Sequence, residues 1–428
     1  MKNQFKYFAY LFLLCLTVAA FASGPGKKTK NDWPQWRGPN RDGISKETGI
    51  LKTWPEGGPK VLWSAPSGDG YSGISVTNGK LYTMYGQRQG SDAIAICLDA
   101  ASGEELWRFR MGSKFTNNFG HGPRATPTVA GNLVFVLSGE GKLFALNATK
   151  GTEVWGHDLH KEYGGKIPTW GVSTSPLVEG NMLIVDVGGK DGFGLVAFNK
   201  KDGKMIWKSD SGIPGYSAPI AVTVNGTRQI LSLAGKALVS VSPKDGKQYW
   251  RYPWVTDYDV NAATPIFIKP DKVFISSGYN RGALVLRMKA ANGTVEVEEL
   301  WKSRAMRNHF SSSILVGDHL YGFDEGTLRC VNVNTGEKKW AEREFTISGL
   351  TRKSGKGSLM YADGHLIVLS EKGLLVLVEA IPDAFVQKAS AQVLKGRCWT
   401  VPTLVNGKLY VRNQKDMLCL DLSQGKQS

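Results

Sequence analysis

The chain has 428 residues, a length that for ordinary globular proteins suggests two or three domains, and its 42% hydrophobic content is ordinary. Lysine and arginine (53) outnumber aspartate and glutamate (37), which gives a formal net charge of +16. A clustered excess of this size would indicate nucleic acid or another acidic partner. Here the basic residues are scattered through turns, so we predict no nucleic-acid partner and interpret the charge as an aid to solubility.

The N-terminus has the pattern of a secretory signal peptide. Lys2 and Lys6 precede an apolar run at residues 8–21, which ends in the A-x-A-like motif Ala20-Phe21-Ala22. We expect residues 1–22 to be cleaved and the protein to be periplasmic or extracellular; an uncleaved anchor is the alternative. No later apolar stretch approaches the 18 residues that a membrane-spanning helix needs, so we expect no transmembrane span after cleavage.

Residues 23–60 are predicted to form a leader followed by a tryptophan-rich N-terminal extension. The extension contains the motif Trp33-Pro-Gln-Trp36-Arg-Gly-Pro-Asn-Arg-Asp-Gly43. Its glycines, prolines and asparagine predict irregular backbone that two buried indoles hold against a surface. The repeat domain that follows is expected at residues 61–422, with a tail at 423–428.

A short pattern in which a glycine lies four residues before a tryptophan recurs along the repeat domain. It appears at Gly103–Trp107, Gly151–Trp155, Gly203–Trp207, Gly246–Trp250 and Gly336–Trp340. One further copy, Gly293–Trp301, is stretched by a charged insert. The interval of roughly 40–50 residues is typical of one four-stranded propeller blade.

The fold class predicted from this repeat is all-β, an eight-bladed β-propeller of four-stranded antiparallel blades. Alternating strands bounded by turn residues place the inner strands near Ile74, Thr128, Pro176, Pro219, Pro265, Ser313, Leu359 and Pro402. The last unit lacks an outer strand, whereas Val61–Ser64 is an outer strand with no unit before it. We predict that this N-terminal strand pairs with residues 417–422 and closes the ring.

The repeat tryptophans are predicted to be core residues between neighbouring blades: Trp63, Trp107, Trp155, Trp207, Trp250, Trp301 and Trp340. The seventh unit is atypical, because its expected outer strand around residues 392–394 contains no tryptophan and residues 381–385 intervene.

Four cysteines follow the signal sequence, and three of them share one repeat position: Cys97, Cys330 and Cys419. Equivalent positions in different blades are usually too far apart for a disulfide. We therefore interpret the cysteines as buried free thiols, and leave open a pair between Cys398 and Cys419.

The repeat and the Trp33–Gly43 motif resemble the pyrroloquinoline-quinone-type (PQQ-like) propeller family over residues 33–422. That family includes quinoprotein alcohol dehydrogenases and the outer-membrane-protein assembly lipoprotein. The resemblance implies the propeller fold, and it is compatible with an enzyme or with a scaffold that has no catalytic role.

In the catalytic members, the resemblance implies a Ca²⁺ ion held by Glu, Asn and Asp, an indole under the quinone, an Asp base and often a disulfide of adjacent cysteines. This chain has no adjacent cysteines, no C-x-x-C-H motif and no evident carboxylate trio near the blade starts. We therefore predict no cofactor and no metal, with PQQ and calcium as the alternative.

The segments just before the inner strands carry bulky or polar residues that blade packing does not require. Converging on one mouth of the channel, they form the predicted ligand- or partner-binding site: Tyr71, His121, Arg124, Trp170, Tyr216, Asn261, Asn308, His309, Arg397 and Trp399. Arginines and indoles around a polar funnel suit a planar or anionic ligand, an extended peptide or a glycan. Alternatively, the same side chains plug the channel.

The function predicted from these features is that of an exported binding or scaffold protein without catalytic activity, in the periplasm or cell envelope. We expect it to be a monomer whose partner is an envelope protein, an extended peptide or a glycan. A PQQ-dependent alcohol or sugar oxidoreductase and a glycan-binding propeller are the alternatives.

Overall fold

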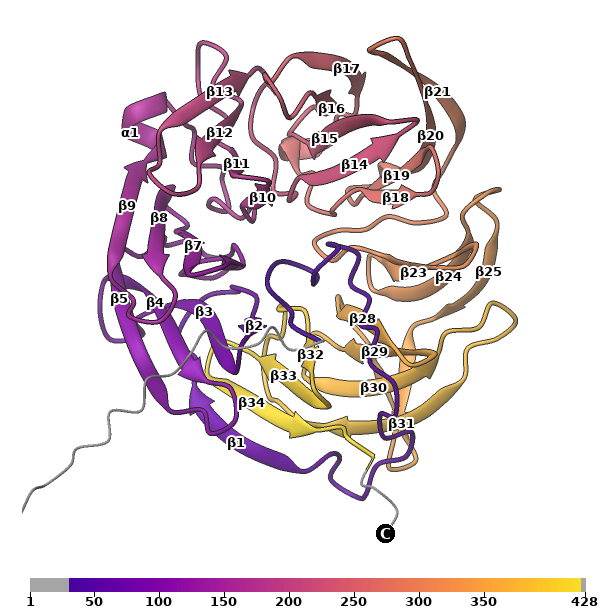
Figure 1. The fold of residues 1–428 in the computed structure, drawn as a ribbon. Helices are drawn as coiled ribbons and strands as arrows, with labels where there is room; N and C mark the ends of the chain where they lie inside the picture. Colours follow the sequence, from indigo (N-terminus) through magenta and orange to yellow (C-terminus); the bar gives the residue numbers. More distant parts are fainter. Residues whose placement is uncertain (1–30, 425–428) are drawn as a thin grey trace, which may run out of the picture.

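The computed structural model describes residues 31–424, so the predicted signal peptide and most of the leader lie outside the described residues. Eight four-stranded antiparallel sheets surround a central channel, and each sheet runs from an inner strand near the axis to an outer strand at the rim (Figure 1). The predicted eight-bladed propeller is confirmed. No helix within residues 31–424 is long and apolar enough to cross a bilayer.

The first four blades follow one another in chain order, each written here from its inner to its outer strand. Blade 1 comprises β2 (Ser75–Thr77), β3 (Lys80–Gly86), β4 (Asp92–Asp99) and β5 (Glu105–Ser113); blade 2 comprises β6 (Thr128–Ala130), β7 (Leu133–Leu137), β8 (Lys142–Asn147) and β9 (Glu153–Asp158). Blade 3 comprises β10 (Leu177–Glu179), β11 (Met182–Asp186), β12 (Leu195–Asn199) and β13 (Met205–Ser209); blade 4 comprises β14 (Ile220–Val224), β15 (Thr227–Leu233), β16 (Ala237–Val241) and β17 (Gln248–Pro253).

The remaining blades complete the ring, and the eighth takes its outer strand from the start of the repeat domain. Blade 5 comprises β18 (Ile266–Ile268), β19 (Lys272–Ser277), β20 (Gly282–Ala291) and β21 (Thr294–Ser303); blade 6 comprises β22 (Ile314–Val316), β23 (His319–Asp324), β24 (Thr327–Asn332) and β25 (Lys338–Glu342). Blade 7 comprises β28 (Ser358–Ala362), β29 (His365–Leu369), β30 (Leu374–Glu379) and β31 (Gln387–Gln392); blade 8 comprises β32 (Thr403–Val405), β33 (Lys408–Arg412), β34 (Asp416–Asp421) and β1 (Val61–Pro66).

Each inner strand begins within one residue of its predicted position. Three elements were not predicted: a hairpin of β26 (Glu344–Ile347) and β27 (Leu350–Lys353), the short helix α1 (Leu159–Tyr163), and a 3₁₀ turn at Asp257–Asp259. The ring closes as predicted, because β1 pairs antiparallel with β34 and aligns Trp63 with Cys419. All four cysteines of the described region are buried and free, so Cys398 and Cys419 are not bonded to each other.

Six of the seven repeat tryptophans link their own blade to the next one by a hydrogen bond. The Nε1 of Trp107 donates to the carbonyl of Ala148 at 3.1 Å, and the ring lies against Gly151. A Cβ on Gly151 would lie 2.5 Å from the ring, and this residue has a φ of +70°, so only glycine fits well here. In five repeats the tryptophan ring of the preceding blade lies against the repeat glycine in this way, at Gly103, Gly151, Gly203, Gly246 and Gly336.

The same indole–carbonyl bond joins six of the eight blade boundaries, including the closure. The pairs are Trp63–Ala100, Trp107–Ala148, Trp155–Lys200, Trp207–Pro243, Trp301–Val333 and Trp340–Ile381. Six of the seven predicted tryptophans are buried in the core and Trp301 is partly buried, which confirms the predicted role.

Trp250 departs from this pattern because the next blade carries the stretched repeat. The charged insert lengthens the β20–β21 hairpin, and a Cβ on Gly293 at its tip would meet no atom within 4 Å, so no indole lies against this glycine. Trp250 therefore donates to Oε1 of Gln229 within its own blade, at 3.1 Å.

The seventh blade has no tryptophan, and its outer strand differs from the prediction. The strand is β31, which ends at Gln392, whereas residues 393 and 394 turn away and donate to the carbonyl of Gly373. Ala389 occupies the tryptophan position, opposite Leu377. Trp54 of the N-terminal extension packs into the same hydrophobic cluster as Ala389, so the extension supplies an indole that the repeat lacks.

Residues 33–47, here called the N-terminal plug, lie inside the ring (Figure 1). Trp33 is 3% exposed and exchanges two backbone hydrogen bonds with Val76 of β2. Tyr361 of β28 bonds to the backbone of Gly43 and Ser45, where the plug runs parallel to the strand. The plug thereby adds short strand-like segments to the inner edges of two blades.

Side chains of the plug bond to further blades. Arg41 donates to the carbonyls of Ser175, Pro176 and Pro219, and Arg37 donates to that of Ser313. Trp36 donates to Thr264, the backbone of Pro34 accepts from Val129, and Glu47 accepts from the N–H groups of Asn406 and Gly407. Residues 33–47 thus contact all eight blades.

Trp155→Ala is expected to destabilise the protein by about 3–5 kcal/mol, as for other buried large aromatic residues. The change removes the ring that lies against Gly203 and the bond to Lys200. Urea unfolding would measure the loss, with Val154→Ala on the exposed face of the same strand as the control. A loss below about 1 kcal/mol would contradict the assigned role.

Deleting the chain before residue 67 is expected to cause aggregation. The deletion leaves β34 as an unpaired edge and also removes the plug and Trp63. Sedimentation and thermal unfolding would measure the effect. A monomer with an unchanged melting temperature would show that ring closure contributes little.

Candidate functional site

A pocket of about 590 Å³ opens at the channel mouth where the segments before the inner strands converge. Seven of the ten predicted site residues line it: Tyr71, Arg124, Trp170, Tyr216, His309, Arg397 and Trp399. The indole of Trp36 also lines the pocket, so the plug forms part of its wall. The pocket has a size typical of ligand sites in proteins.

The other three predicted residues are not in the pocket lining. Asn261 and Asn308 are fully buried beside it, where their amide groups donate to backbone carbonyls such as those of Trp254 and Phe323. The exposed His121 accepts a bond from the N–H of Asn117 through Nδ1. These residues hold the mouth loops in place, since unpaired backbone carbonyls there would otherwise be buried.

The rings at the mouth form a nearly continuous circle, here called the aromatic ring. Neighbouring centroids lie 4.9–6.4 Å apart in the sequence Phe119, Trp170, Tyr258, Tyr279, His309, Phe310, Trp399 and Tyr71. The hydroxyl of Tyr71 closes the circle by donating to the carbonyl of Phe119 at 2.8 Å. Such tilted and edge-on contacts are the favoured geometries of aromatic pairs.

Two arginines at the mouth have different roles. Arg124 is mostly buried, packs over the Phe115 ring at 4.7 Å and donates to the carbonyls of Gly120 and Gly122. Burial lowers its pKa to about 10. Arg397 is exposed and lies over the Trp399 ring at 4.5 Å. Arg397 also donates through Nη1 to the carbonyl of Phe119 at 2.8 Å. Arg124 therefore shapes the mouth, whereas Arg397 keeps an exposed positive charge at its edge.

Glu371 is the single carboxylate among the residues that line the pocket. Its Oε1 accepts from Nε1 of Trp399 at 3.0 Å, and its Oε2 accepts from the backbone N–H of Lys356 at 3.1 Å. The carboxylate thus fixes the orientation of one indole of the aromatic ring.

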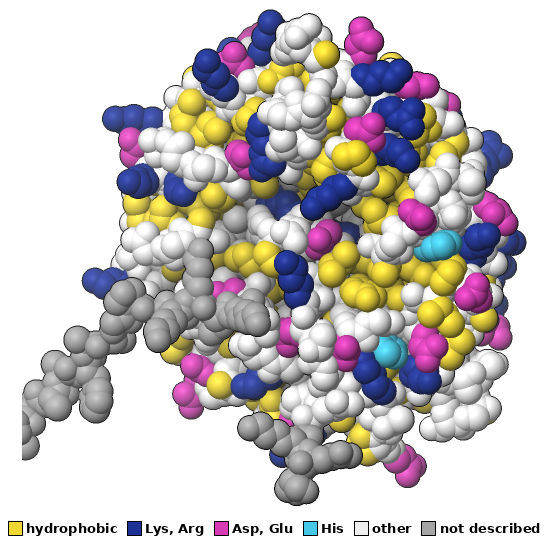
Figure 2. Space-filling view, turned by 45° about the vertical axis from the view of Figure 1, so that its right-hand side comes forward, with side chains coloured by type: hydrophobic (Ala, Val, Ile, Leu, Met, Phe, Trp, Pro, Cys, Tyr) yellow, Lys and Arg dark blue, Asp and Glu magenta, His cyan; other side chains and the backbone are white. Residues whose placement is uncertain are grey.

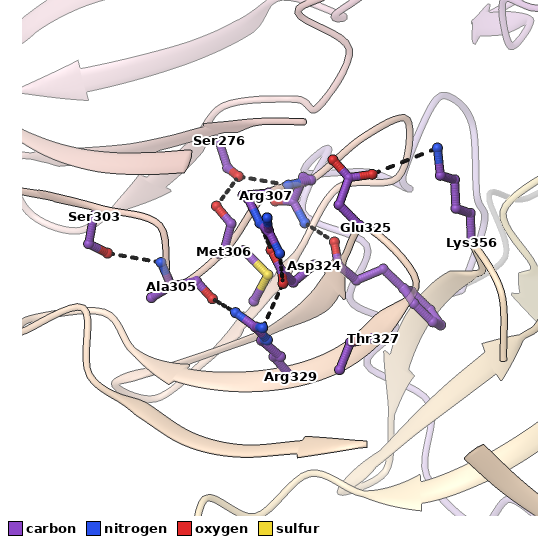
Figure 3. A network of polar contacts seen from close by, with 12 residues as sticks. Ser276, Ser303, Ala305, Met306, Arg307, Asp324, Glu325, Thr327, Arg329 and Lys356 are labelled. Atoms are coloured by element: carbon purple, nitrogen blue, oxygen red, sulfur yellow. Dashed lines mark hydrogen bonds and ion pairs between the residues drawn. The ribbon is translucent and has the colours of Figure 1, made fainter. Parts of the chain in front are cut away.

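An ion-pair network around the buried Asp324 supports the part of the mouth that carries His309 (Figure 3). Asp324 is 1% exposed and binds both Arg307 at 2.7 Å and Arg329 at 2.8 Å. Glu325 next to it pairs with Lys356 at 3.7 Å, and Lys356 lines the pocket. The network ties the loop before β22 to the end of β23, because Arg307 belongs to the first and Asp324 to the second.

Several pocket residues were missed by sequence reasoning: Phe119, Tyr279, Phe310, Lys356 and Glu371. Phe119 and Phe310 are next to the segments named in the sequence analysis, so their aromatic side chains could have been included in the predicted site. Tyr279 and Glu371 come from the β19–β20 and β29–β30 turns, and no repeat position marks them. Lys356 lies just before the inner strand β28, in a segment where the prediction named no residue. Only the closed ring brings these turns to the mouth.

The donor set of the pocket does not fit a calcium-held quinone. Ca²⁺ takes six to eight oxygen ligands, whereas the two oxygens of Glu371 already accept hydrogen bonds. Within residues 31–424, no group of three or more His, Cys, Asp or Glu side chains is placed to hold a metal ion.

His309 predicts how stability changes with pH. Burial and the nearby Lys356 lower its pKa from 6.5 to about 4. The folded protein then keeps the imidazole neutral while the unfolded chain takes up a proton, so stability is lost as the pH falls from about 6.5 to 4. His309→Gln removes this contribution, which is about 3 kcal/mol. Urea unfolding at pH 7 and pH 4 would measure it, and equal losses in both proteins would contradict it.

The comparisons with known proteins agree with the architecture. The family model described as "Outer membrane protein assembly factor BamB" matches residues 91–342. The curated protein of that name from Shewanella oneidensis is 24% identical over 393 residues, which cover 85% of this chain and 88% of that protein.

Solved structures show the same fold at low identity. BamB from Moraxella catarrhalis has a TM-score of 0.59 at 14% identity, covering 85% of this chain and 99% of that one. Quinohemoprotein alcohol dehydrogenase from Comamonas testosteroni has a TM-score of 0.61 at 11% identity, covering 93% and 82%. Both likenesses concern the fold alone. Because the family model covers more than half of the chain, this protein belongs to the BamB-type family of PQQ-like β-propellers.

Proposed function

We propose that this protein is an exported scaffold of the cell envelope whose channel mouth binds an extended segment of a partner protein. The observation that carries the proposal is the aromatic ring around a pocket that the plug lines from within. Tyrosine, tryptophan and arginine are the residues most enriched at the energetic centres of protein interfaces. The relatives' description as outer membrane assembly factors supports the same class of role.

Export is part of this proposal and rests on the signal pattern at residues 1–22, which lie outside the described residues. If that segment is cleaved as proposed, the intact mass of the protein recovered from the envelope corresponds to a chain that starts at Ser23.

A peptide partner fits the mouth better than a small planar cofactor does. Two members of the aromatic ring, Phe119 and Tyr258, are 56% and 74% exposed. Exposed rings at a rim add contact area for a long ligand, whereas a small molecule would touch only the pocket beneath. Arg397 adds an accessible positive charge at the same edge.

Site-specific photo-crosslinking in the native envelope tests the proposal. A photoreactive residue at position 119 or 258 is expected to form an adduct with a partner protein, because both side chains face outward at the mouth. The matched control is position 106, since Leu106 is 47% exposed on an outer strand. Adducts from position 106 alone would indicate that the partner binds the outer edge of the propeller and not the mouth. Retention of a glycan by the purified protein would favour the glycan-binding alternative.

The double change Trp170→Ala with Arg397→Ala is expected to weaken partner retention at least about tenfold with little change in melting temperature. Both side chains line the pocket and are partly or fully exposed. Arg124→Ala serves as the contrast, because losing its buried bonds to Gly120 and Gly122 should cost about 1–3 kcal/mol of stability. Pull-downs and thermal unfolding on the same samples would compare them. If the double variant is destabilised but still retains the partner fully, the two side chains fill the channel mouth and have no role in binding.

A further inference from the structure

The plug shows how the inner edge of a blade accepts a polypeptide. In an antiparallel pair, alternate residues direct their N–H and C=O away from the partner strand. Val76 is such a residue, one before the turn of the β2–β3 hairpin, and it bonds to Trp33 of the plug at 2.8 and 2.9 Å. Tyr361 has the same position in β28 and bonds to Gly43 and Ser45.

The same position is open in the blades that the plug backbone does not reach. The register of the hairpins places Val178 of β10, Phe267 of β18 and Leu315 of β22 at the position of Val76. In the longer strand β14, Ala221 lies two residues before that position and has the same orientation. In the described part of the chain, no hydrogen bond joins their channel-facing N–H or C=O groups to the plug, unlike those of Val76. Each of these blades therefore presents one free donor and one free acceptor to the channel.

A second cavity, here called the plug-side cavity, lies beside these unpaired backbone groups of the inner strands. It has a volume of about 610 Å³, and it is lined by inner-strand residues and by the plug: Val178, Ala221, Phe267, Leu315, Ile44 and Arg41 among others. The mouth pocket shares none of its lining residues with this cavity. Figure 1 shows the plug on the side of β28 and β32, across the channel from β14.

The charge of the plug-side cavity favours an acidic occupant. The buried Arg41 guanidinium bonds to backbone carbonyls and to Gln35, with no carboxylate on it. Lys46 and Lys269 are exposed at the edge. Of the two acidic residues in the lining, Glu179 is already paired with Arg228 at 2.7 Å, and Asp42 accepts from the N–H of Ile44.

We propose that the plug-side cavity binds an extended segment of a partner protein, apolar in alternate positions and carrying an acidic residue, by adding it to the inner edges of blades 3 to 6. The plug pairs with the inner edges of some blades around the channel, and the bound segment would pair with the remaining ones. It would make one backbone pair with each blade. Main-chain bonds supply the affinity, and the apolar walls and the exposed Lys46 and Lys269 select the side chains.

Hydrogen–deuterium exchange tests the free edges directly. In the free protein, the amides of Val178, Ala221 and Leu315 are expected to exchange faster than those of Val76 and Tyr361, which the plug protects. The probe is a short blocked peptide that alternates valine and glutamate. Adding it should slow exchange at the three free amides about tenfold or more and leave the mouth unchanged. Binding without this protection would overturn the proposal, as would no binding at millimolar peptide.

Proline substitution tests the backbone pairing. Ala221→Pro removes one channel-facing N–H but no bond between β14 and β15, and is expected to weaken probe binding about tenfold. Thr223→Pro is the matched control, because Thr223 has the same orientation in β14 and does not line the cavity. Equal affinity of the Ala221 and Thr223 variants would contradict strand addition.

Charge reversal gives a second test that does not depend on how the proline variants fold. Lys46→Glu with Lys269→Glu should weaken binding of the glutamate peptide about tenfold at low salt, and Lys201→Glu on an outer turn should not. A lysine version of the peptide should fail to bind. Tight binding of that version, of a peptide matching residues 23–30, or of a second copy of the chain in sedimentation would assign the cavity to another occupant.

Discussion

The packing of the repeat tryptophans against the following blade, which at six boundaries includes a hydrogen bond, is the interaction on which the rest of the structure depends. A blade of four short strands buries little surface alone, so the ring is stable only if neighbouring sheets are packed face to face. The indole supplies a large apolar surface, and its N–H satisfies a carbonyl of the next blade that would otherwise be buried unpaired. The glycine of the next repeat has no side chain, so the ring can lie directly against its backbone.

Two blade boundaries lack the usual tryptophan–carbonyl bond, and they show that the space between blades must be filled even where the repeat pattern changes. In the stretched repeat, Gly293 lies at the tip of a long hairpin and does not contact Trp250. Trp250 donates instead to Gln229 of its own blade. Where the seventh blade has Ala389 in place of tryptophan, Trp54 packs into the same cluster from the N-terminal extension. Both boundaries remain filled, because an empty volume of that size would cost several kcal/mol.

Ring closure and the plug together give the two ends of the channel different surfaces. The plug enters beside β32 and β2 and contacts all eight blades, yet it pairs by backbone with only a few of them. One end of the channel is therefore a pocket ringed by aromatic side chains, and the other is a cavity edged by free backbone groups and lysines. Lysine and arginine elsewhere are interspersed with acidic residues, as Figure 2 shows for one face.

The sequence by itself determined the fold class, the eight blades, the starts of their inner strands and the role of the repeat tryptophans. Periodicity is a local signal, and each repeat must bury the same residues against its neighbour. It also indicated the mouth through Trp170 and Trp399, which lie outside the repeat register. Only the tertiary structure decided that Asn261 and Asn308 support the loops instead of lining the pocket, and that Glu371 and Lys356 join it. Whether a polar side chain is buried or exposed depends on segments far away in the chain, and residues 33–47 reach every blade only after the ring has closed.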